Sequence, residues 1–316
     1  MEPWTSFWQQ GHSTTFGPFF KNGYEGAVKN WWLDVLKINK ARVDLLDIGC
    51  GNGALLIDTL GILENGSYTG IDLANVQFSE PALEKMSLYP EFEATLHNQT
   101  AAESLPFSAA SFDLVSSIFG IEYSDLNKSI PEAFRVLRPN GAFKALIHAK
   151  ESVITEMSVR ALGEYRDADM STILESLNTI DAELNRLKSP ASLKKSNKAE
   201  SARSNLNTLA QKYMSNLDPR TGNAIMVQFV GDSLKFFKIL RHSEAVRRDY
   251  LDGLKSEFDA SRSRYKAMAA AAKSADQIGD ITAVMQDIGF KSVESAYLHS
   301  DLEKKEIAAW QLTATK

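Results

Sequence analysis

An apolar segment that ends in an acid and leads into a glycine-rich turn constrains this chain more than any other feature. Residues 43–48 read Val-Asp-Leu-Leu-Asp-Ile, glycine follows at positions 49, 51 and 53, and apolar residues then resume. Glycines at alternate positions permit unusual backbone torsions and close approach of the main chain to a neighbour. The pattern predicts a strand, a tight turn and a helix, with a site for a nucleoside-containing ligand at the carboxyl end of the strand.

A second strand with an acidic end strengthens this interpretation. Residues 67–73 read Ser-Tyr-Thr-Gly-Ile-Asp-Leu, which places Asp72 at the end of an apolar segment. A carboxylate at this position can accept hydrogen bonds from both ribose hydroxyls of an adenosine. Two structural alternatives stay open: Asp72 as a helix N-cap or turn residue, and Asp47 as a turn residue at the end of its strand.

Three further motifs follow in order, at residues 101–107, 111–118 and 132–143. With them the chain resembles a class I S-adenosylmethionine-dependent methyltransferase over residues 43–148 and again over 281–316. The resemblance implies an α/β fold, a doubly wound, Rossmann-like, seven-stranded sheet. It also implies S-adenosylmethionine as cofactor and S-adenosylhomocysteine as product.

The resemblance further implies cofactor-binding roles for individual residues. The methionine part of the cofactor would be surrounded by Asp47, Gly49, Gly51 and Gly53, the ribose diol would be held by Asp72, the adenine would be bordered by Leu73, Ala102 and Glu103, and the sulfonium side would lie above Ile118. One position departs from the family pattern, because Ala101 stands where an aspartate often accepts from the adenine amino group.

A nicotinamide cofactor is the competing interpretation of the glycine turn. The dehydrogenase fingerprint is Gly-x-Gly-x-x-Gly, whereas the spacing here is Gly-x-Gly-x-Gly with Asp47 two residues before the first glycine. A carboxylate there would repel a pyrophosphate and attract the ammonium group of a methionine moiety. The sign of this charge argues against a dinucleotide.

Composition sets broad limits on partners and compartment. The 316 residues include 35 Lys and Arg and 40 Asp and Glu, and the net charge of −5 gives no general attraction to nucleic acid. A single cysteine excludes an intrachain disulfide and suits a reducing cytoplasm. No leader-like or membrane-spanning stretch and no metal-ligand cluster stands out. We therefore expect a cytoplasmic protein without a nucleic-acid or membrane partner, and its oligomeric state stays open.

Four regions are expected along the chain. Residues 1–42 are rich in aromatic residues and predict a helical lid, in which His12, Thr15 and Phe16 are candidates for ligand contact; packing against the main domain is the alternative. Residues 43–150 predict the cofactor-binding core, with strands at 43–48, 67–72, 92–97, 112–118 and 142–148. Residues 279–316 complete it with a helix at 281–288 and strands at 293–298 and 308–315.

Between these parts, residues 151–278 predict an inserted helical cap. Apolar residues recur at positions 173, 177, 180, 184 and 187, and again at 202, 206, 209, 213 and 217, the spacing of packed helices. Further helices are expected at 223–240 and 243–272. Basic residues are frequent at 186–203 and 235–248, but acidic residues lie among them, so a solvated helical face is favoured over a nucleic-acid site.

Candidates for the chemistry follow the fourth and fifth strands. They are Glu122, Tyr123 and His148, with His148 as the possible base and Glu122 as a polar contact. No Asn/Asp-Pro-Pro motif follows strand four, which leaves oxygen, sulfur, carbon and aliphatic nitrogen as acceptor atoms. The sequence favours a methyltransferase with a small-molecule acceptor. Two alternatives stay open: a non-catalytic relative whose cap docks a protein partner, and a methyltransferase acting on RNA or protein.

Overall fold

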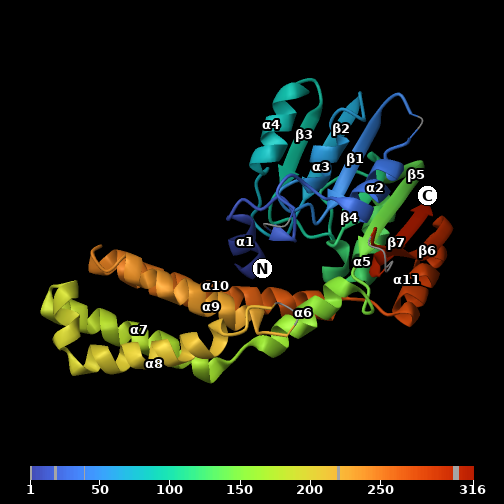
Figure 1. The fold of residues 1–316 in the computed structure, drawn as a ribbon. Coiled ribbons are helices and arrows are strands. Elements are labelled where there is room, and N and C mark those ends of the chain that lie inside the picture. Colours follow the sequence, from blue (N-terminus) through green and yellow to red (C-terminus); the bar gives the residue numbers. More distant parts are fainter. Residues whose placement is uncertain (1, 18–19, 39, 219–220, 302–305) are drawn as a thin grey trace. The chain divides into compact units, whose positions relative to one another are not determined.

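A seven-stranded sheet is the centre of the larger part of this computed structural model, which describes residues 2–17, 20–38, 40–218, 221–301 and 306–316 (Figure 1). The strands are β1 (Val43–Ile48), β2 (Gly66–Ile71), β3 (Glu93–His97), β4 (Phe112–Ile118), β5 (Leu137–Ile147), β6 (Lys291–His299) and β7 (Ile307–Thr315). Their order in the sheet is β3-β2-β1-β4-β5-β7-β6. The pairs among β1 to β5 are parallel, and β7 runs antiparallel to both β5 and β6.

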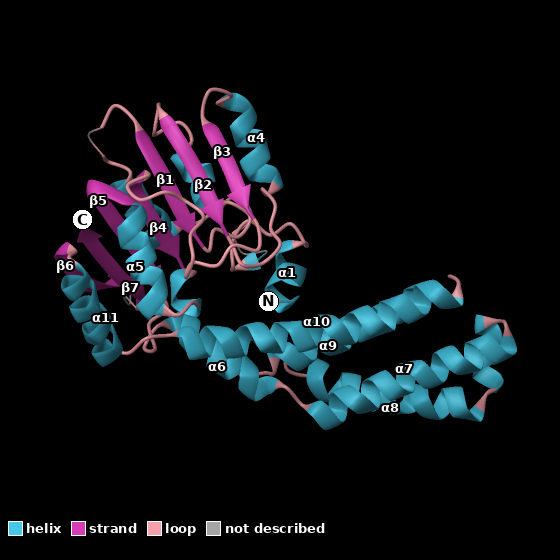
Figure 2. Ribbon diagram, turned by 180° about the vertical axis from the view of Figure 1, so that it is seen from behind, coloured by secondary structure: helices cyan, strands magenta, loops and turns pink. Residues whose placement is uncertain are grey.

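Helices cover both faces of this sheet, as Figure 2 shows in cyan against magenta strands. The helices of this part of the chain are α1 (Glu2–Trp8), α2 (Gly26–Val35), α3 (Ala54–Thr59), α4 (Glu80–Leu88), α5 (Leu126–Val136) and α11 (Ala275–Ile288), with a short 3-10 turn, η2 (Ile121–Tyr123). The chain crosses from one face to the other at β1, whose two neighbours are β2 and β4. Such a reversal places ligand sites at the carboxyl ends of the strands. The predicted fold class is confirmed.

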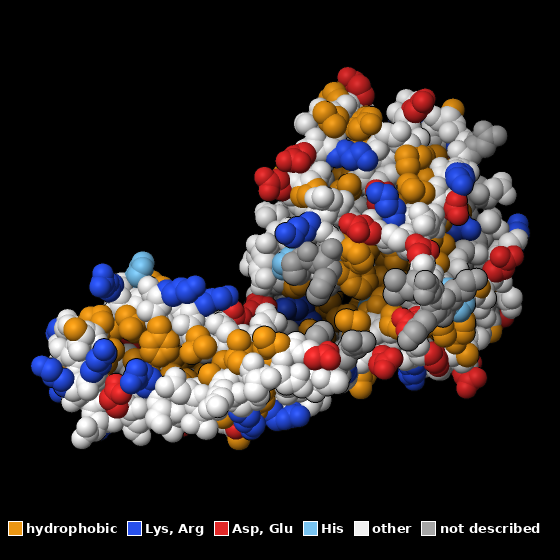
Figure 3. Space-filling view, viewed as in Figure 1, with side chains coloured by type: hydrophobic (Ala, Val, Ile, Leu, Met, Phe, Trp, Pro, Cys, Tyr) orange, Lys and Arg blue, Asp and Glu red, His pale blue; other side chains and the backbone are white. Residues whose placement is uncertain are grey.

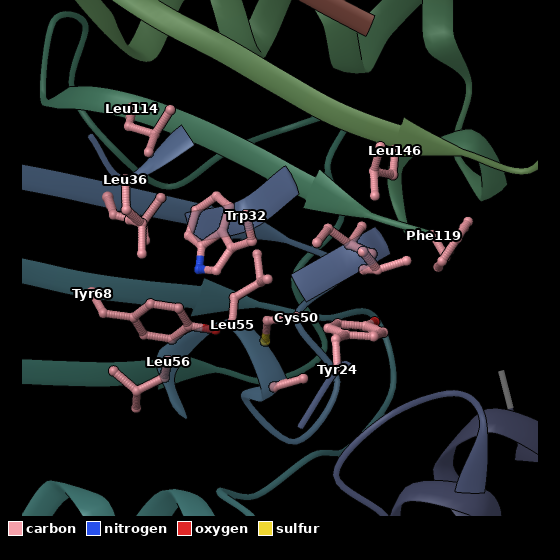
Figure 4. Close-up of a cluster of buried hydrophobic side chains, with 14 of the residues drawn as sticks. Tyr24, Trp32, Leu36, Cys50, Leu55, Leu56, Tyr68, Leu114, Phe119 and Leu146 are labelled. Atoms are coloured by element: carbon pink, nitrogen blue, oxygen red, sulfur yellow. The ribbon is translucent and has the colours of Figure 1, made fainter. Parts of the chain in front are cut away.

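Side chains alternate across the sheet and fill two separate cores, as the period of a strand requires. Leu45 belongs to the core shared with α1, α2 and α3, where Trp32 is fully buried (Figure 4). Leu46, its neighbour in sequence, belongs to the core shared with α5 and α11, which includes Ile130 and Met285. β1 is buried on both sides, which explains its nearly continuous apolar sequence.

Two elements begin well before the residue that the sequence predicts. β5 begins at Leu137 rather than at 142, because its pairing with β4 shifts register and Asn140 takes a left-handed conformation (φ 61°) within the strand. α11 begins at Ala275 rather than at 281, because Ser274 and Gln277 form a capping box at its N-terminus. In both cases local hydrogen bonding extends an element beyond its apolar pattern.

Residues 158–266 form a second compact unit, called the helical unit here; the remainder is called the sheet unit. Its helices are α6 (Val153–Glu164), α7 (Asp167–Leu187), α8 (Asn197–Met214), α9 (Ala224–Lys235) and α10 (Glu244–Ala271), with 3-10 turns η3 (Pro190–Lys195) and η4 (Phe236–Lys238). Both ends of the unit fall inside helices, since the chain passes through α6 and α10 between the two units.

The apolar stripes expected in this region form the core of the helical unit. Ile173, Leu177 and Leu206 are buried among its helices. One position was predicted wrongly: α8 ends at Met214, so Leu217 lies beyond the helix and is 60% exposed. Among the described residues, no helix combines the length and the apolarity needed to cross a membrane.

Candidate functional site

The glycine turn after β1 has the backbone conformation that its sequence predicts. Gly49, Gly51 and Gly53 all have positive φ angles, of 71°, 50° and 82°. A Cβ atom on Gly49 would lie 2.6 Å from the Cα of Gly120, and one on Gly51 would lie 2.5 Å from the Trp8 indole. The missing side chains are therefore required by contacts inside the protein, and the indole of Trp8 covers the outer side of Gly51.

Two acids lie at the carboxyl ends of β1 and β2: Asp47 is buried and Asp72 is half-buried. Asp47 accepts a hydrogen bond from the Tyr68 hydroxyl at 2.7 Å. Asp72 accepts from the N–H of Gly51 at 2.9 Å and from the N–H of Ala74 at 2.8 Å. The Asp72 carboxylate thus ties the glycine turn to the loop that follows β2.

Among the residues that the structure describes, no cationic side chain forms an ion pair with either acid. Burial, together with the charge of Asp72, raises the pKa of Asp47 to about 7, against the opposing hydrogen bond from Tyr68. Burial also raises the pKa of Asp72, while its backbone hydrogen bonds act in the opposite direction. Two mutually repelling carboxylates in a low-dielectric site favour a positively charged ligand.

The three candidate residues for chemistry form one cluster, in which Glu122 and His148 are buried and Tyr123 is half-buried. Glu122 and Tyr123 belong to η2, and His148 directly follows β5. The Glu122 Oε1 atom accepts from the backbone N–H of His148 at 3.0 Å. The His148 ring stacks on Phe119, with centroids 4.5 Å apart, and its centroid lies 6.0 Å from that of Tyr123. The structure therefore brings the three candidates together, and their catalytic roles stay predictions.

Four polar atoms of this cluster have no hydrogen-bond partner among the described residues. They are Glu122 Oε2, the Tyr123 hydroxyl oxygen, and His148 Nδ1 and Nε2. Buried polar groups are normally hydrogen-bonded, and an orphaned group costs about 1–3 kcal/mol. Four such atoms in one place indicate a site built for a polar ligand.

Burial moves the pKa values of this cluster in opposite directions. It raises the pKa of Glu122 to about 7, although the backbone N–H of His148 and the charge of Lys273 act against the rise. Burial lowers the pKa of His148 to about 3. At neutral pH the imidazole is therefore uncharged, and Glu122 exchanges its proton near neutrality.

Tyr24 links the paired acids to this cluster. Burial raises the pKa of its hydroxyl, and the carboxylates of Asp47 and Glu122 both contribute to the rise. In Figure 4 its ring lies beside Cys50, at the edge of the buried aromatic and aliphatic side chains. Tyr24 therefore stands within electrostatic range of both groups of acids.

The segment that carries these residues matches a known family. Residues 45–141 match the family model described as a methyltransferase domain. A ubiquinone/menaquinone biosynthesis C-methyltransferase from Rickettsia bellii is 30% identical over 125 residues, which is 38% of this chain and 50% of the relative. The chain contains a class I S-adenosylmethionine-dependent methyltransferase domain. A demethylmenaquinone methyltransferase from Desulfitobacterium hafniense is 28% identical over 132 residues, or 40% of this chain and 52% of that protein.

The chain spans about half the length of the curated relatives it matches. Among solved structures, a geranyl diphosphate C-methyltransferase from Streptomyces coelicolor is 18% identical with a TM-score of 0.32, covering 38% of this chain and 44% of that one. A chain solved in work on thioacetal formation during echinomycin biosynthesis is 14% identical with a TM-score of 0.44, covering 94% of this chain and 84% of that one.

The N-terminal segment packs against the glycine turn of the methyltransferase domain. The Asn52 side-chain amide donates to the carbonyl oxygens of Trp8 and His12, each at 2.8 Å. The Phe16 ring meets Phe119 edge to face, with centroids 5.9 Å apart. Phe16 therefore borders the buried cluster, whereas His12 contacts the turn through its carbonyl oxygen.

The remaining candidates for adenine and sulfonium contact have different surroundings in the methyltransferase domain. Leu73 is 41% exposed, while Ala102 and Ile118 are buried. Glu103 accepts from the backbone N–H of Asp125 at 2.8 Å, so it connects the loop after β3 to the start of α5. The cofactor contacts assigned to these four residues stay predictions.

Sequence reasoning missed four residues of this site: Tyr24, Asn52, Tyr68 and Trp8. Tyr68 pairs with Leu45 in the parallel register of β2 and β1. The sequence of β2 does not indicate which acid the Tyr68 hydroxyl will contact. Asn52 offered a usable signal, because a side-chain amide between two glycines can bond the chain that crosses the turn.

Proposed function

We propose that this protein transfers a methyl group from S-adenosylmethionine to a small-molecule acceptor. One observation carries the proposal: the buried Asp47 and the half-buried Asp72 lie at adjacent strand ends, the charge of Asp72 helps to raise the pKa of Asp47, and neither acid has a cationic partner among the described residues. A cofactor with an ammonium group and a sulfonium centre suits such a site, whereas a pyrophosphate does not. The names of the curated relatives, which are methyltransferases of quinone biosynthesis, support a small-molecule acceptor.

The residues present fit this cofactor by charge and by hydrogen-bonding capacity. Asp47 would hold the ammonium group, and Asp72 has oxygen lone pairs beyond those used by Gly51 and Ala74 with which to accept from ribose hydroxyls. When bound, S-adenosylmethionine supplies a methyl group on a positively charged sulfur. The protein's own task is to align an acceptor with that sulfur, exclude water and remove a proton from the acceptor.

The cluster of Glu122, Tyr123 and His148 supplies the groups for the last task. Glu122 Oε2 is buried and has no partner, and a carboxylate with a pKa about 7 is matched to proton removal near neutral pH. His148, with a pKa of about 3, is a poor base but serves as a neutral hydrogen-bonding group. We therefore assign the base to Glu122 and the polar contact to His148, the reverse of the division that the sequence favoured.

Glu122 as base restricts the acceptor to a group that loses a proton on methylation. A hydroxyl, a thiol, an aliphatic ammonium or an acidic carbon meets this condition. The buried aromatic rings of Phe119 and Tyr24 beside the cluster favour an acceptor that is largely apolar around its reacting atom.

Titration calorimetry with S-adenosylhomocysteine tests the proposed function. We expect saturable binding by the folded protein and roughly tenfold weaker binding by Asp72→Ala, about 1.4 kcal/mol. Asp34→Ala is the control, since Asp34 is an exposed residue of α2. Absence of binding by the folded wild-type protein would count against the proposal, and equal affinities of wild type and Asp72→Ala would remove the ribose assignment alone.

A further inference from the structure

The helical unit brings two separate basic segments of the chain to one end. Arg247, near the start of α10, donates to Asp181 at 2.5 Å and also to Asn185, and both acceptors lie near the end of α7. The opposite end is marked by the Tyr165 hydroxyl, which donates to the carbonyl of Phe258 at 3.3 Å. The turn between α7 and α8 and the turn between η4 and α10 therefore lie together (Figure 1).

Five basic side chains at this end have no acidic partner among the described residues. They are exposed and are here called the basic end: Lys188, Lys194, Lys195, Lys238 and Arg241. Neighbouring cations are compensated, as in the pairs of Arg186 with Glu183 and of Lys235 with Asp232. The helical unit carries 19 Lys and Arg against 14 Asp and Glu, although the whole chain has a net charge of −5. The basic end therefore concentrates positive charge that the rest of the molecule lacks.

Apolar side chains stand among these cations. Leu234 is 36% exposed and Val246 is 44% exposed, while Leu187, Ile239 and Leu240 are half-buried. On the helical unit, Figure 3 shows a strip of hydrophobic side chains (orange) with Lys and Arg side chains (blue) along its borders. Apolar residues bordered by Lys and Arg are the pattern of a surface that lies in a membrane interface.

We propose that the basic end of the helical unit binds the surface of a bilayer that contains anionic lipids. Cations near the surface are attracted by lipid phosphates, and aliphatic side chains gain by entering the headgroup layer. Single-stranded nucleic acid is the less suitable occupant, because it is held by exposed aromatic platforms, and Phe236 and Phe237 at this end are buried and half-buried. This binding is peripheral, and it departs from the sequence-based expectation of no membrane partner.

Vesicle co-sedimentation of the 316-residue chain tests this proposal. We expect binding to phosphatidylcholine vesicles that contain phosphatidylglycerol, little binding to phosphatidylcholine alone, and loss of binding as salt is raised. The double variant Lys194→Glu/Lys238→Glu, with one change in each turn, is expected to weaken binding by roughly tenfold or more. Each single variant is expected to have a smaller effect in the same direction, since both turns contribute.

The control is the double variant Lys255→Glu/Lys266→Glu, which makes the same charge change at exposed positions of α10 away from the basic end. It is expected to bind vesicles nearly as well as the wild type. Equal losses in both double variants would show a general charge effect and overturn the proposal. So would absence of vesicle binding, or salt-sensitive binding to single-stranded RNA without binding to vesicles. Circular dichroism checks that the variants are folded.

Discussion

At the scale of single residues, the surroundings of an aspartate decide whether its pKa is raised or lowered. Asp47 and Asp113 are both strand acids, yet the pKa of Asp47 is raised and that of Asp113 is lowered. Asp113 forms ion pairs with Lys40 and Arg138, whereas among the described residues Asp47 is bonded by a single side chain, the Tyr68 hydroxyl. A sequence presents both as acids next to apolar residues, so this difference comes from the folded structure.

The buried Asp47 should make the protein more stable in mild acid than at alkaline pH. Its folded-state pKa of about 7 lies above the unfolded value, so the stabilisation is complete below that unfolded value and is lost as pH rises through 7. In Asp47→Asn this contribution is absent, and the amide oxygen can still accept from Tyr68. We expect the unfolding midpoint in urea to fall less between pH 5 and pH 8 in the variant, and to exceed that of the wild type at pH 8.

A parallel pH dependence of wild type and Asp47→Asn would contradict this reasoning. Glu122 has a pKa raised to about 7 by the same cause, so part of the wild-type decline should persist in Asp47→Asn. In the double variant with Glu122→Gln the decline should be smaller still, with a remainder from Asp72, whose pKa is also raised by burial. The difference in decline between Asp47→Asn and the double variant therefore measures the contribution of Glu122.

Glu122→Gln should reduce turnover without removing the contact to His148. The amide oxygen can still accept the backbone N–H of His148, but the side chain can no longer take a proton. We expect kcat to fall by about 10²–10⁴-fold with a small change in the acceptor KM, and the rise in rate through pH 7 to disappear. Steady-state rates across pH, once an acceptor is known, provide the measurement. If the rate of Glu122→Gln still rises through pH 7, another residue is the base.

At the scale of elements, the packing of α1 depends on one amide in the glycine turn. Asn52 is fully buried, donates to the carbonyls of Trp8 and His12, and accepts from the N–H of Gln77 at 3.1 Å. It therefore joins the turn, the N-terminal segment and the loop before α4. Secondary-structure propensity and hydrophobic periodicity describe each of these segments separately. They do not predict that one side chain will join all three.

Asn52→Asp should loosen the N-terminal segment while retaining the bond to Gln77. The carboxylate cannot donate, so two carbonyl acceptors lose their partner, at a cost of about 1–3 kcal/mol each. We expect faster amide hydrogen exchange over residues 2–12 and unchanged exchange in β4 and β5. Asn75→Ala is the control, because the Asn75 side chain is exposed. Equal exchange of residues 2–12 in wild type and Asn52→Asp would show that α1 is held by its aromatic contacts alone.

At the scale of the whole molecule, the two units have separate apolar cores. The cores on the two faces of the sheet draw on residues of the sheet unit, and the third core lies within residues 158–266. Within the helical unit, Arg247 and Asp181 form a buried ion pair, with side chains 5% and 9% exposed. The stability of each unit should therefore respond to different substitutions.

Arg247→Met should destabilise the helical unit selectively. Removing the guanidinium leaves the Asp181 carboxylate buried without its partner, which typically costs about 3–5 kcal/mol. Arg248→Met is the matched control, because Arg248 pairs with Glu244 at the surface and should cost about 0–1 kcal/mol. Hydrogen exchange with peptide-level resolution should show faster exchange in α7 and α10 but not in β1 and β4. Similar acceleration in both units would indicate a single cooperative fold.

The sequence by itself determined the sheet, its strand segments, the left-handed glycine turn and the acids at two strand ends, because these follow from local period and backbone sterics. Only the tertiary structure decided which groups lack partners. It buried Glu122 and His148 side by side with orphaned atoms, and it joined the start of α10 to the last turns of α7 through Arg247. Proton affinity and uncompensated charge depend on every group within a few ångströms, and those neighbours come from distant parts of the chain.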